Sequence, residues 1–245
     1  MLFGAQLAGL AAIALAVAVR GQGPAGGAEV LLAIPAAISG TLGIWAYYRG
    51  MAVGAMSVVA PIAGVSAIVP VTVGLATGDN PSPAQIFGIL VALVGVGLAS
   101  REHQAGQRRL AAGVGLALLA ALGFGGYFVP MHAAGSADFW WASLVFRATS
   151  FVMIGLAALS ARRSVTVSRR DAVYISAVGI GDTLGNFLYA ASASHGLVSV
   201  TSVLASLYPV VTVVLARVVL GERVDRIQDV GIVAVLAGVV LISAG

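Results

Sequence analysis

Long apolar runs separated by short polar breaks dominate the sequence. Each run is close to the 20 or so apolar residues that an α-helix needs to cross a bilayer. The nine runs are Leu2–Val19, Glu29–Tyr48, Gly54–Thr77, Pro83–Ser100, Leu110–Met131, Phe139–Ala161, Ala172–Ser194, Leu197–Leu220 and Val224–Ala244. The alternation of apolar and polar residues that a barrel strand requires is absent. The pattern predicts an all-α integral membrane protein with about nine transmembrane helices.

The composition supports a membrane location and excludes several classes of function. Apolar residues make up 60% of the chain and charged residues 9%, whereas a soluble domain carries roughly 25% charged residues. The absence of cysteine excludes disulfides, thiol catalysis and cysteine-ligated metals. The basic residues are all arginines and gather at the ends of the runs, so we expect no nucleic-acid binding.

Catalytic and cofactor motifs are not found. His103, His132 and His195 lie near the ends of runs without the spacing of a metal site. The glycines of Gly179–Gly185 lack both the spacing and the preceding strand of a dinucleotide-binding loop. We therefore predict neither an enzyme nor a bound metal or cofactor.

An internal repeat links two segments that lie 143 residues apart. Gly78–Ser100 and Gly221–Ser243 share nine identities in 23 positions. The identical pairs are Gly78/Gly221, Gln85/Gln228, Gly88/Gly231, Ile89/Ile232, Leu93/Leu236, Gly95/Gly238, Val96/Val239, Leu98/Leu241 and Ser100/Ser243. The shared loop, glutamine and glycine register favours a duplication over a chance match between apolar helices.

The number of helices in each copy predicts how the copies lie in the membrane. The second copy holds five predicted helices and the first holds four. An odd number per copy gives successive copies opposite orientations, the inverted-repeat architecture of many secondary transporters. We therefore expect two inverted five-helix repeats, residues 1–101 and 108–245, the first lacking its first helix because the chain starts late. A true nine-helix protein is the alternative.

Several motifs resemble EamA-type carriers of the drug/metabolite transporter superfamily. The resemblance rests on Leu204-Ala-Ser-Leu-Tyr-Pro-Val-Val-Thr, on Leu220-Gly-Glu-Arg and on Phe124-Gly-Gly-Tyr-Phe-Val, in which phenylalanine stands where tryptophan is usual. The segment Asp182-Thr-Leu-Gly-Asn-Phe-Leu-Tyr resembles the eighth helix of one branch. The resemblance covers essentially the whole chain and implies a ten-helix carrier that moves small metabolites by alternating access.

Two ionisable residues lie deep inside predicted helices, Arg147 in the sixth run and Asp182 in the seventh. A charge at this depth costs about 2.5–3.5 kcal/mol on insertion scales, so it should face the protein interior and be paired. Because the two helices are consecutive and antiparallel, each residue is the nearest plausible partner of the other. Two interpretations stay open: an ion pair that fixes helix register, or a pair that contacts substrate or accepts a coupling proton.

A polar stripe extends this candidate cavity along the seventh run. Asp182, Asn186 and Tyr189 are spaced i, i+4 and i+7 and share one helix face. Such a stripe lines a cavity or forms hydrogen bonds to neighbouring helices, and both interpretations stay open. We predict Tyr127 and Tyr208 as aromatic lining of the same cavity.

Two prolines interrupt the third and eighth runs at roughly corresponding places of the two repeats, Pro70 and Pro209. Proline removes a backbone hydrogen bond and frees a carbonyl group. Helices broken at matching positions point to a transporter site near the midplane, whereas simple kinking for packing is the alternative.

The predicted function is that of a multi-pass carrier in the cytoplasmic membrane, moving an amino acid or a related small metabolite. Its partners are the solute, the lipid bilayer and, unless it is a facilitator, a proton or another coupling ion; nothing implies an oligomer. The arginine-rich loops favour a cytoplasmic location for their own side of the membrane, while the family resemblance implies the opposite orientation. The alternative function is a non-transporting, truncated membrane protein that acts as an assembly partner.

Overall fold

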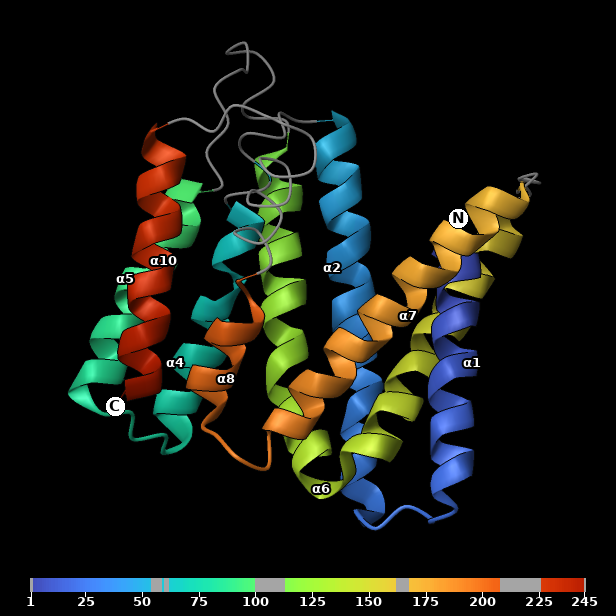
Figure 1. Ribbon diagram of the computed structural model, residues 1–245. Helices are drawn as coiled ribbons and strands as arrows, with labels where there is room; N and C mark the ends of the chain where they lie inside the picture. Colours follow the sequence, from blue (N-terminus) through green and yellow to red (C-terminus); the bar gives the residue numbers. More distant parts are fainter. Residues whose placement is uncertain are drawn as a thin grey trace. The chain divides into compact units, whose positions relative to one another are not determined.

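A computed structural model describes residues 2–53, 59, 62–99, 113–161, 168–207 and 226–244, in which every regular element is a helix (Figure 1). The helices are α1 (Leu2–Arg20), α2 (Ala33–Val53), α4 (Ile68–Thr77), α5 (Pro83–Ala99), α6 (Val114–Ala161), α7 (Arg169–Ser192), α8 (Val198–Ala205) and α10 (Arg226–Ala244). Two short 3₁₀ helices, η1 (Gly27–Leu32) and η2 (Val65–Ala67), precede α2 and α4.

Three stretches among the described residues are long and apolar enough to cross a membrane, namely Phe3–Arg20, Gly27–Val53 and Val114–Ser160. Large apolar side chains stand exposed on such helices; Leu159, for example, is 76% exposed. Such exposure suits side chains that face lipid. The all-helical membrane class is thus confirmed, while the count of nine helices and the inverted repeats stay predictions.

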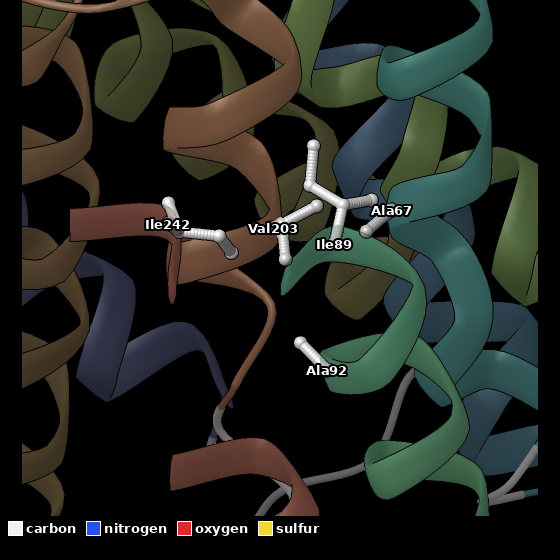
Figure 2. Close-up of a cluster of buried hydrophobic side chains, with 5 residues drawn as sticks. All are labelled: Ala67, Ile89, Ala92, Val203 and Ile242. Carbon is white, nitrogen blue, oxygen red and sulfur yellow. The ribbon is translucent and has the colours of Figure 1, made fainter. Parts of the chain in front are cut away.

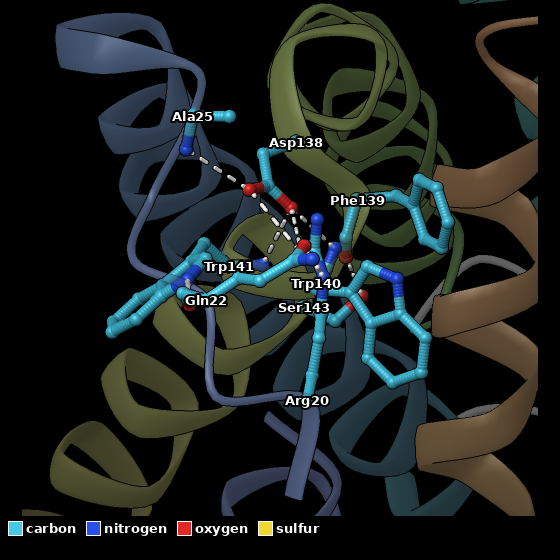
Figure 3. Close-up of polar contacts among 8 residues, drawn as sticks. All are labelled: Arg20, Gln22, Ala25, Asp138, Phe139, Trp140, Trp141 and Ser143. Carbon is cyan, nitrogen blue, oxygen red and sulfur yellow. Dashed lines mark hydrogen bonds and ion pairs between the residues drawn. The ribbon is translucent and has the colours of Figure 1, made fainter. Parts of the chain in front are cut away.

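Helix α6 consists of two helices that meet at Asp138, whose backbone is extended (φ −160°, ψ 99°). Its 48 residues would span about 70 Å as one helix, more than twice the hydrocarbon core. Asp138 begins the second half, because its Oδ1 accepts hydrogen bonds from the backbone N–H of Trp140 (3.0 Å) and Trp141 (3.3 Å) (Figure 3). Arg20 and the backbone N–H of Ala25 also donate to this carboxylate, so α1 and the chain after it are tied to the bend.

The chain packs as two units, which combine segments from both predicted repeats. Unit 1 comprises Met1–Thr41 and Val129–Gly196, and unit 2 comprises Leu42–Phe128 and Leu197–Gly245. A unit that packs together need not be continuous in sequence, so the division into 1–101 and 108–245 stays a prediction about duplication.

Unit 1 is held together where α1 crosses α7 at small residues. A Cβ added to Gly179 would meet the backbone of Ala5, and one added to Gly9 would meet the carbonyl of Gly179 at 2.8 Å and the hydroxyl of Thr183. The two backbones therefore approach as closely as glycine permits, which is a common way for helices to associate in lipid.

Unit 2 is built around α5 and α10, which lie side by side (Figure 1). A Cβ on Gly88 would stand 2.8 Å from the carbonyl oxygen of Gly238, and one on Gly95 would stand 2.8 Å from that of Gly231. An apolar cluster then joins the pair to α8 and η2 (Figure 2). Its buried members are Ala67, Ile89, Ala92, Val203 and Ile242.

Candidate functional site

The candidate site lies in unit 1, around a guanidinium group enclosed by three helices. Arg147 on α6 is 1% exposed. Its Nη1 donates to Oε1 of Gln6 on α1 at 2.7 Å and to Oδ2 of Asp182 on α7 at 2.8 Å. The ion pair that we predicted from the two charges in apolar runs is therefore present, and Gln6 is an additional partner.

The hydrogen bonds of Arg147 are incomplete. A guanidinium has five N–H donors, and the two donors on Nη1 are used by Gln6 and Asp182. The remaining donors, on Nε and Nη2, are buried and have no hydrogen-bond partner among the described residues. A buried donor without a partner costs about 1–3 kcal/mol, and more for a charged group. The Phe146 ring, 5.8 Å from Cζ, offers only a weak cation–π contact.

Asp182 is the exposed partner of this pair. Its side chain is 51% exposed, against 1% for Arg147. The backbone carbonyl of Asp182 accepts a hydrogen bond from Nδ2 of Asn186 at 2.9 Å, and its Oδ1 accepts a longer one at 3.4 Å. The pair is therefore asymmetric, with a fixed, buried cation and an anion that keeps contact with its surroundings.

An apolar cavity of about 250 Å³ opens between α1, α6 and α7 in the same unit. It is lined by Ala12, Ile13, Ala16, Trp140, Ile180, Thr183, Leu184 and Phe187. The rings of Trp140 and Phe187 meet edge to face with their centroids 4.8 Å apart. Thr183 lines the cavity and also lies close to the cation, because a Cβ on Gly9 would meet both its hydroxyl and, at 3.4 Å, Nε of Arg147.

Comparison with known proteins decides what kind of membrane protein carries this site. The model of the EamA-like transporter family matches residues 111–244, which is more than half of the chain. The chain belongs to the EamA-like transporter family. No curated protein is significantly similar to it.

Among 24 matching chains of solved structures, one titled "Crystal structure of protein" has a TM-score of 0.69 and 17% sequence identity. The similarity covers 98% of each chain. At this identity the likeness concerns the fold alone. It agrees with the helical EamA-like architecture without assigning a solute.

The remaining predicted site residues of this EamA-like transporter belong to both units. Tyr189 on α7 is buried in unit 1, although it was predicted on one face with the half-exposed Asp182. Tyr127 on α6 is buried in unit 2, where its ring packs on Phe128 at 5.1 Å. Tyr208 and Pro209 lie outside the described residues. The roles of Tyr127 and Tyr208 as cavity lining and of Pro209 as a helix break therefore stay predictions.

Pro70 lies in α4, two residues after its start, and the 3₁₀ turn η2 directly precedes this helix. Because proline has no N–H, the carbonyl of Ser66 four residues earlier has no helical partner. A Cβ on Gly125 of α6 would stand 2.7 Å from this carbonyl oxygen, so a glycine accommodates the freed group. The hydroxyl of Ser66 is also buried without a hydrogen-bond partner among the described residues.

Sequence reasoning missed Gln6, Gly9 and Thr183, which surround Arg147. A single glutamine in an apolar run is a weak signal, yet in lipid it needs a partner as a charged residue does. Groups of three or more His, Cys, Asp or Glu side chains that could hold a metal ion are not found in the described part of the chain.

Proposed function

We propose that this EamA-like protein is a secondary carrier that moves a small metabolite across the cytoplasmic membrane by alternating access. The observation that carries the proposal is the incompletely paired cation in unit 1: Arg147 is buried, but only Nη1 has hydrogen-bond partners. An ion pair selected only for stability would use the remaining donors as well. Donors held without partners inside a transporter are available to a solute.

Reciprocal glycine contacts in unit 2 support the inverted repeat on which alternating access rests. Gly88 lies against Gly238, and Gly95 lies against Gly231. The repeat equates Gly88 with Gly231 and Gly95 with Gly238, so exchanging the two copies converts one contact into the other. A two-fold axis produces such reciprocal contacts. The two helices are antiparallel through these contacts, so a two-fold axis that relates them lies perpendicular to both. Inverted repeats have an axis of this orientation.

The sequence provides no nucleotide-binding motif, so the energy for transport comes from a proton or solute gradient, unless the protein is a facilitator. Asp182 is the candidate for ion coupling, since its side chain is half exposed while its partner is buried. An ionisable residue inside a membrane protein is by default a candidate for such a role.

The test of this proposal is counterflow of radiolabelled amino acids, carboxylates and nucleobases into proteoliposomes that contain the full chain. We expect Asp182→Asn to reduce uptake about tenfold or more while the melting temperature changes little, because the amide keeps the shape but loses the charge. The matched control is Asp171→Asn on the same helix, where the carboxylate is exposed at the first turn; its uptake should equal that of the wild type.

Two outcomes would contradict the proposal. Wild-type uptake by Asp182→Asn together with a lowered melting temperature would make the pair structural. Absence of uptake for every solute, by this chain and by an N-terminally extended form, would favour the non-transporting assembly partner.

A further inference from the structure

The geometry points to a carboxylate site in unit 1: the Nε and Nη2 edge of Arg147 binds the carboxylate of a small amphipathic anion, whose apolar body occupies the cavity beside Trp140 and Phe187. The inference rests on the proposed function in one respect, since the bound anion is taken to be the carried solute.

The unpaired donors of Arg147 have the arrangement that a carboxylate requires. Nε and Nη2 lie on the same side of the planar guanidinium, and each directs one N–H along the same edge. The two oxygens of a carboxylate accept such parallel donors as a bidentate pair. Gln6 and Asp182 both bind Nη1, so this edge is buried without a hydrogen-bond partner among the described residues. A neutral acceptor with a single oxygen would satisfy one donor and leave the other unpaired.

The surroundings of this edge indicate where the rest of the ligand lies. On the α1 side Nε of this edge lies at Gly9, since a Cβ added there would stand 3.4 Å from Nε and would also meet the hydroxyl of Thr183. Thr183 also lines the apolar cavity, together with Trp140 and Phe187. The volume of about 250 Å³ is below the roughly 300–1,000 Å³ of pockets for drug-sized ligands. The cavity therefore suits a small apolar or aromatic group attached to the carboxylate.

The charge balance explains how such an anion could be both bound and released. In the structure Asp182 neutralises Arg147 through a single contact at 2.8 Å, and the Asp182 side chain is half exposed. A solute carboxylate on the free edge replaces Asp182 as the counter-ion, and Asp182 can turn outward without leaving a buried cation unpaired. When the solute leaves, Asp182 returns. Because the edge is covered in this conformation, the solute reaches it as α1 and α7 separate.

The experiment measures equilibrium binding of phenylacetate and of neutral phenylacetamide to the purified full chain by isothermal titration calorimetry. We expect phenylacetate to bind about 10- to 100-fold more tightly than the amide, the range of one or two charge-assisted hydrogen bonds. Arg147→Lys should abolish this preference, because an ammonium group can still contact Gln6 and Asp182 but has no bidentate edge. Arg49→Lys is the matched control at an exposed arginine of α2 and should leave binding unchanged.

Asp182→Asn distinguishes this mechanism from a merely structural pair. If the solute replaces Asp182 as counter-ion, removing the competing charge should tighten phenylacetate binding several-fold, although transport falls. Ala16→Leu should weaken binding by filling the cavity, while Ala11→Leu at an exposed position of the same helix should not. These two variants leave Arg147 in place and test the site even if Arg147→Lys folds poorly.

Three results would overturn the inference: equal affinity for the acid and the amide, unchanged binding by Arg147→Lys, or weaker binding by Asp182→Asn. Binding of oleate without binding of phenylacetate would also overturn it, since the occupant would then be a membrane lipid. Uptake assays separate the two proposals. If the protein carries other solutes and Arg147→Lys leaves phenylacetate binding unchanged, the carboxylate site is disproved but the carrier function is not. If the protein binds the carboxylate but takes up no solute, the carrier function is disproved but the binding site is not.

Discussion

Units 1 and 2 differ in the groups that they bury between helices of similar composition. In unit 1, α1 and α7 cross at Ala5, Gly9 and Gly179, and beside this crossing a guanidinium group is sealed from its surroundings. In unit 2, α5 and α10 meet through reciprocal glycine contacts, and the described part of this unit has no buried charged side chain. Both units use small residues for close approach, but among the described residues a fully buried charge is found in unit 1 and not in unit 2.

The comparison indicates that the charge is not needed to associate the helices. Helices in lipid associate through close packing and interhelical hydrogen bonds, because there is no hydrophobic driving force between them. In unit 2, α5 and α10 come into close contact at glycines, without a buried charge among the described residues. Arg147 therefore adds an insertion cost of about 2.5–3.5 kcal/mol to a crossing that small residues already provide. We interpret this to mean that Arg147 is kept for its function in spite of the cost.

The largest effect is expected when the interior of unit 1 is made as apolar as that of unit 2. In Arg147→Met with Asp182→Leu, we expect uptake to fall to background. The melting temperature should stay unchanged or rise, because replacing an internal ion pair by apolar residues is neutral or stabilising by about 1–4 kcal/mol. Uptake into proteoliposomes and thermal unfolding in one detergent measure the two effects.

The single variant Asp182→Leu serves as the control for the double variant. It leaves the buried Arg147 with Gln6 as its remaining hydrogen-bond partner and should lower the melting temperature. If the double variant unfolds as readily as this single variant, the pair holds unit 1 together and the difference between the units disappears.

A smaller effect is expected from adding one methyl group to the glycine contact of unit 2. Gly95→Ala places Cβ 2.7 Å from the backbone nitrogen of Val235, and backbone atoms cannot move aside as a side chain can. We expect a loss of about 1–3 kcal/mol in the free energy of unfolding, the usual cost of overpacking. Gly97→Ala is the matched control two residues further along α5, because a Cβ there meets nothing within 4 Å. Equal stability of both variants would mean that α5 and α10 are not in backbone contact.

The sequence was informative where an apolar background made a polar residue conspicuous. Arg147 and Asp182 could be paired from their depths in consecutive runs, and the 3₁₀ turn before α4 lies where Pro70 removes a hydrogen bond. Helical periodicity was less informative for the polar stripe. It places Asp182 and Tyr189 on one face but does not say what covers that face, and the structure buries only Tyr189.

Other features depend on contacts across long sequence separations. Gln6 binds a residue 141 positions away, and nothing near it in the chain indicates that partner. The cavity beside Trp140 is lined by residues of α1, α6 and α7, so it depends on how three helices pack, which their individual sequences do not specify. At Asp138, by contrast, the sequence analysis already separated two runs, Leu110–Met131 and Phe139–Ala161, and the bend in α6 confirms this separation. An aspartate directly before an apolar run is also a helix-start signal.

The smallest expected difference between the units concerns the hydrogen bonds at the first turns of α8 in unit 2 and α7 in unit 1. In unit 2, Oδ2 of Asp79 accepts hydrogen bonds from the backbone N–H (2.9 Å) and the hydroxyl (2.7 Å) of Ser199 at the first turn of α8, 120 residues away. In unit 1, Ser168 caps α7 locally through the N–H of Asp171 at 3.1 Å. Both interactions satisfy a donor at a helix start, but the first also ties two distant segments together.

We therefore expect Asp79→Ala to cost more than Ser168→Ala. The first variant loses two hydrogen bonds to a charged group, about 1.5–3 kcal/mol each, while the exposed cap of α7 is worth about 1 kcal/mol. Chemical denaturation of the purified chain measures both losses, and Asp79→Asn, which keeps an acceptor oxygen, should fall between them. If Ser168→Ala is the more damaging change, the connection between α4 and α8 contributes nothing beyond a local cap. The hydrogen bonds between Asp79 and Ser199 would then result from the packing of unit 2 and would not help to stabilise it.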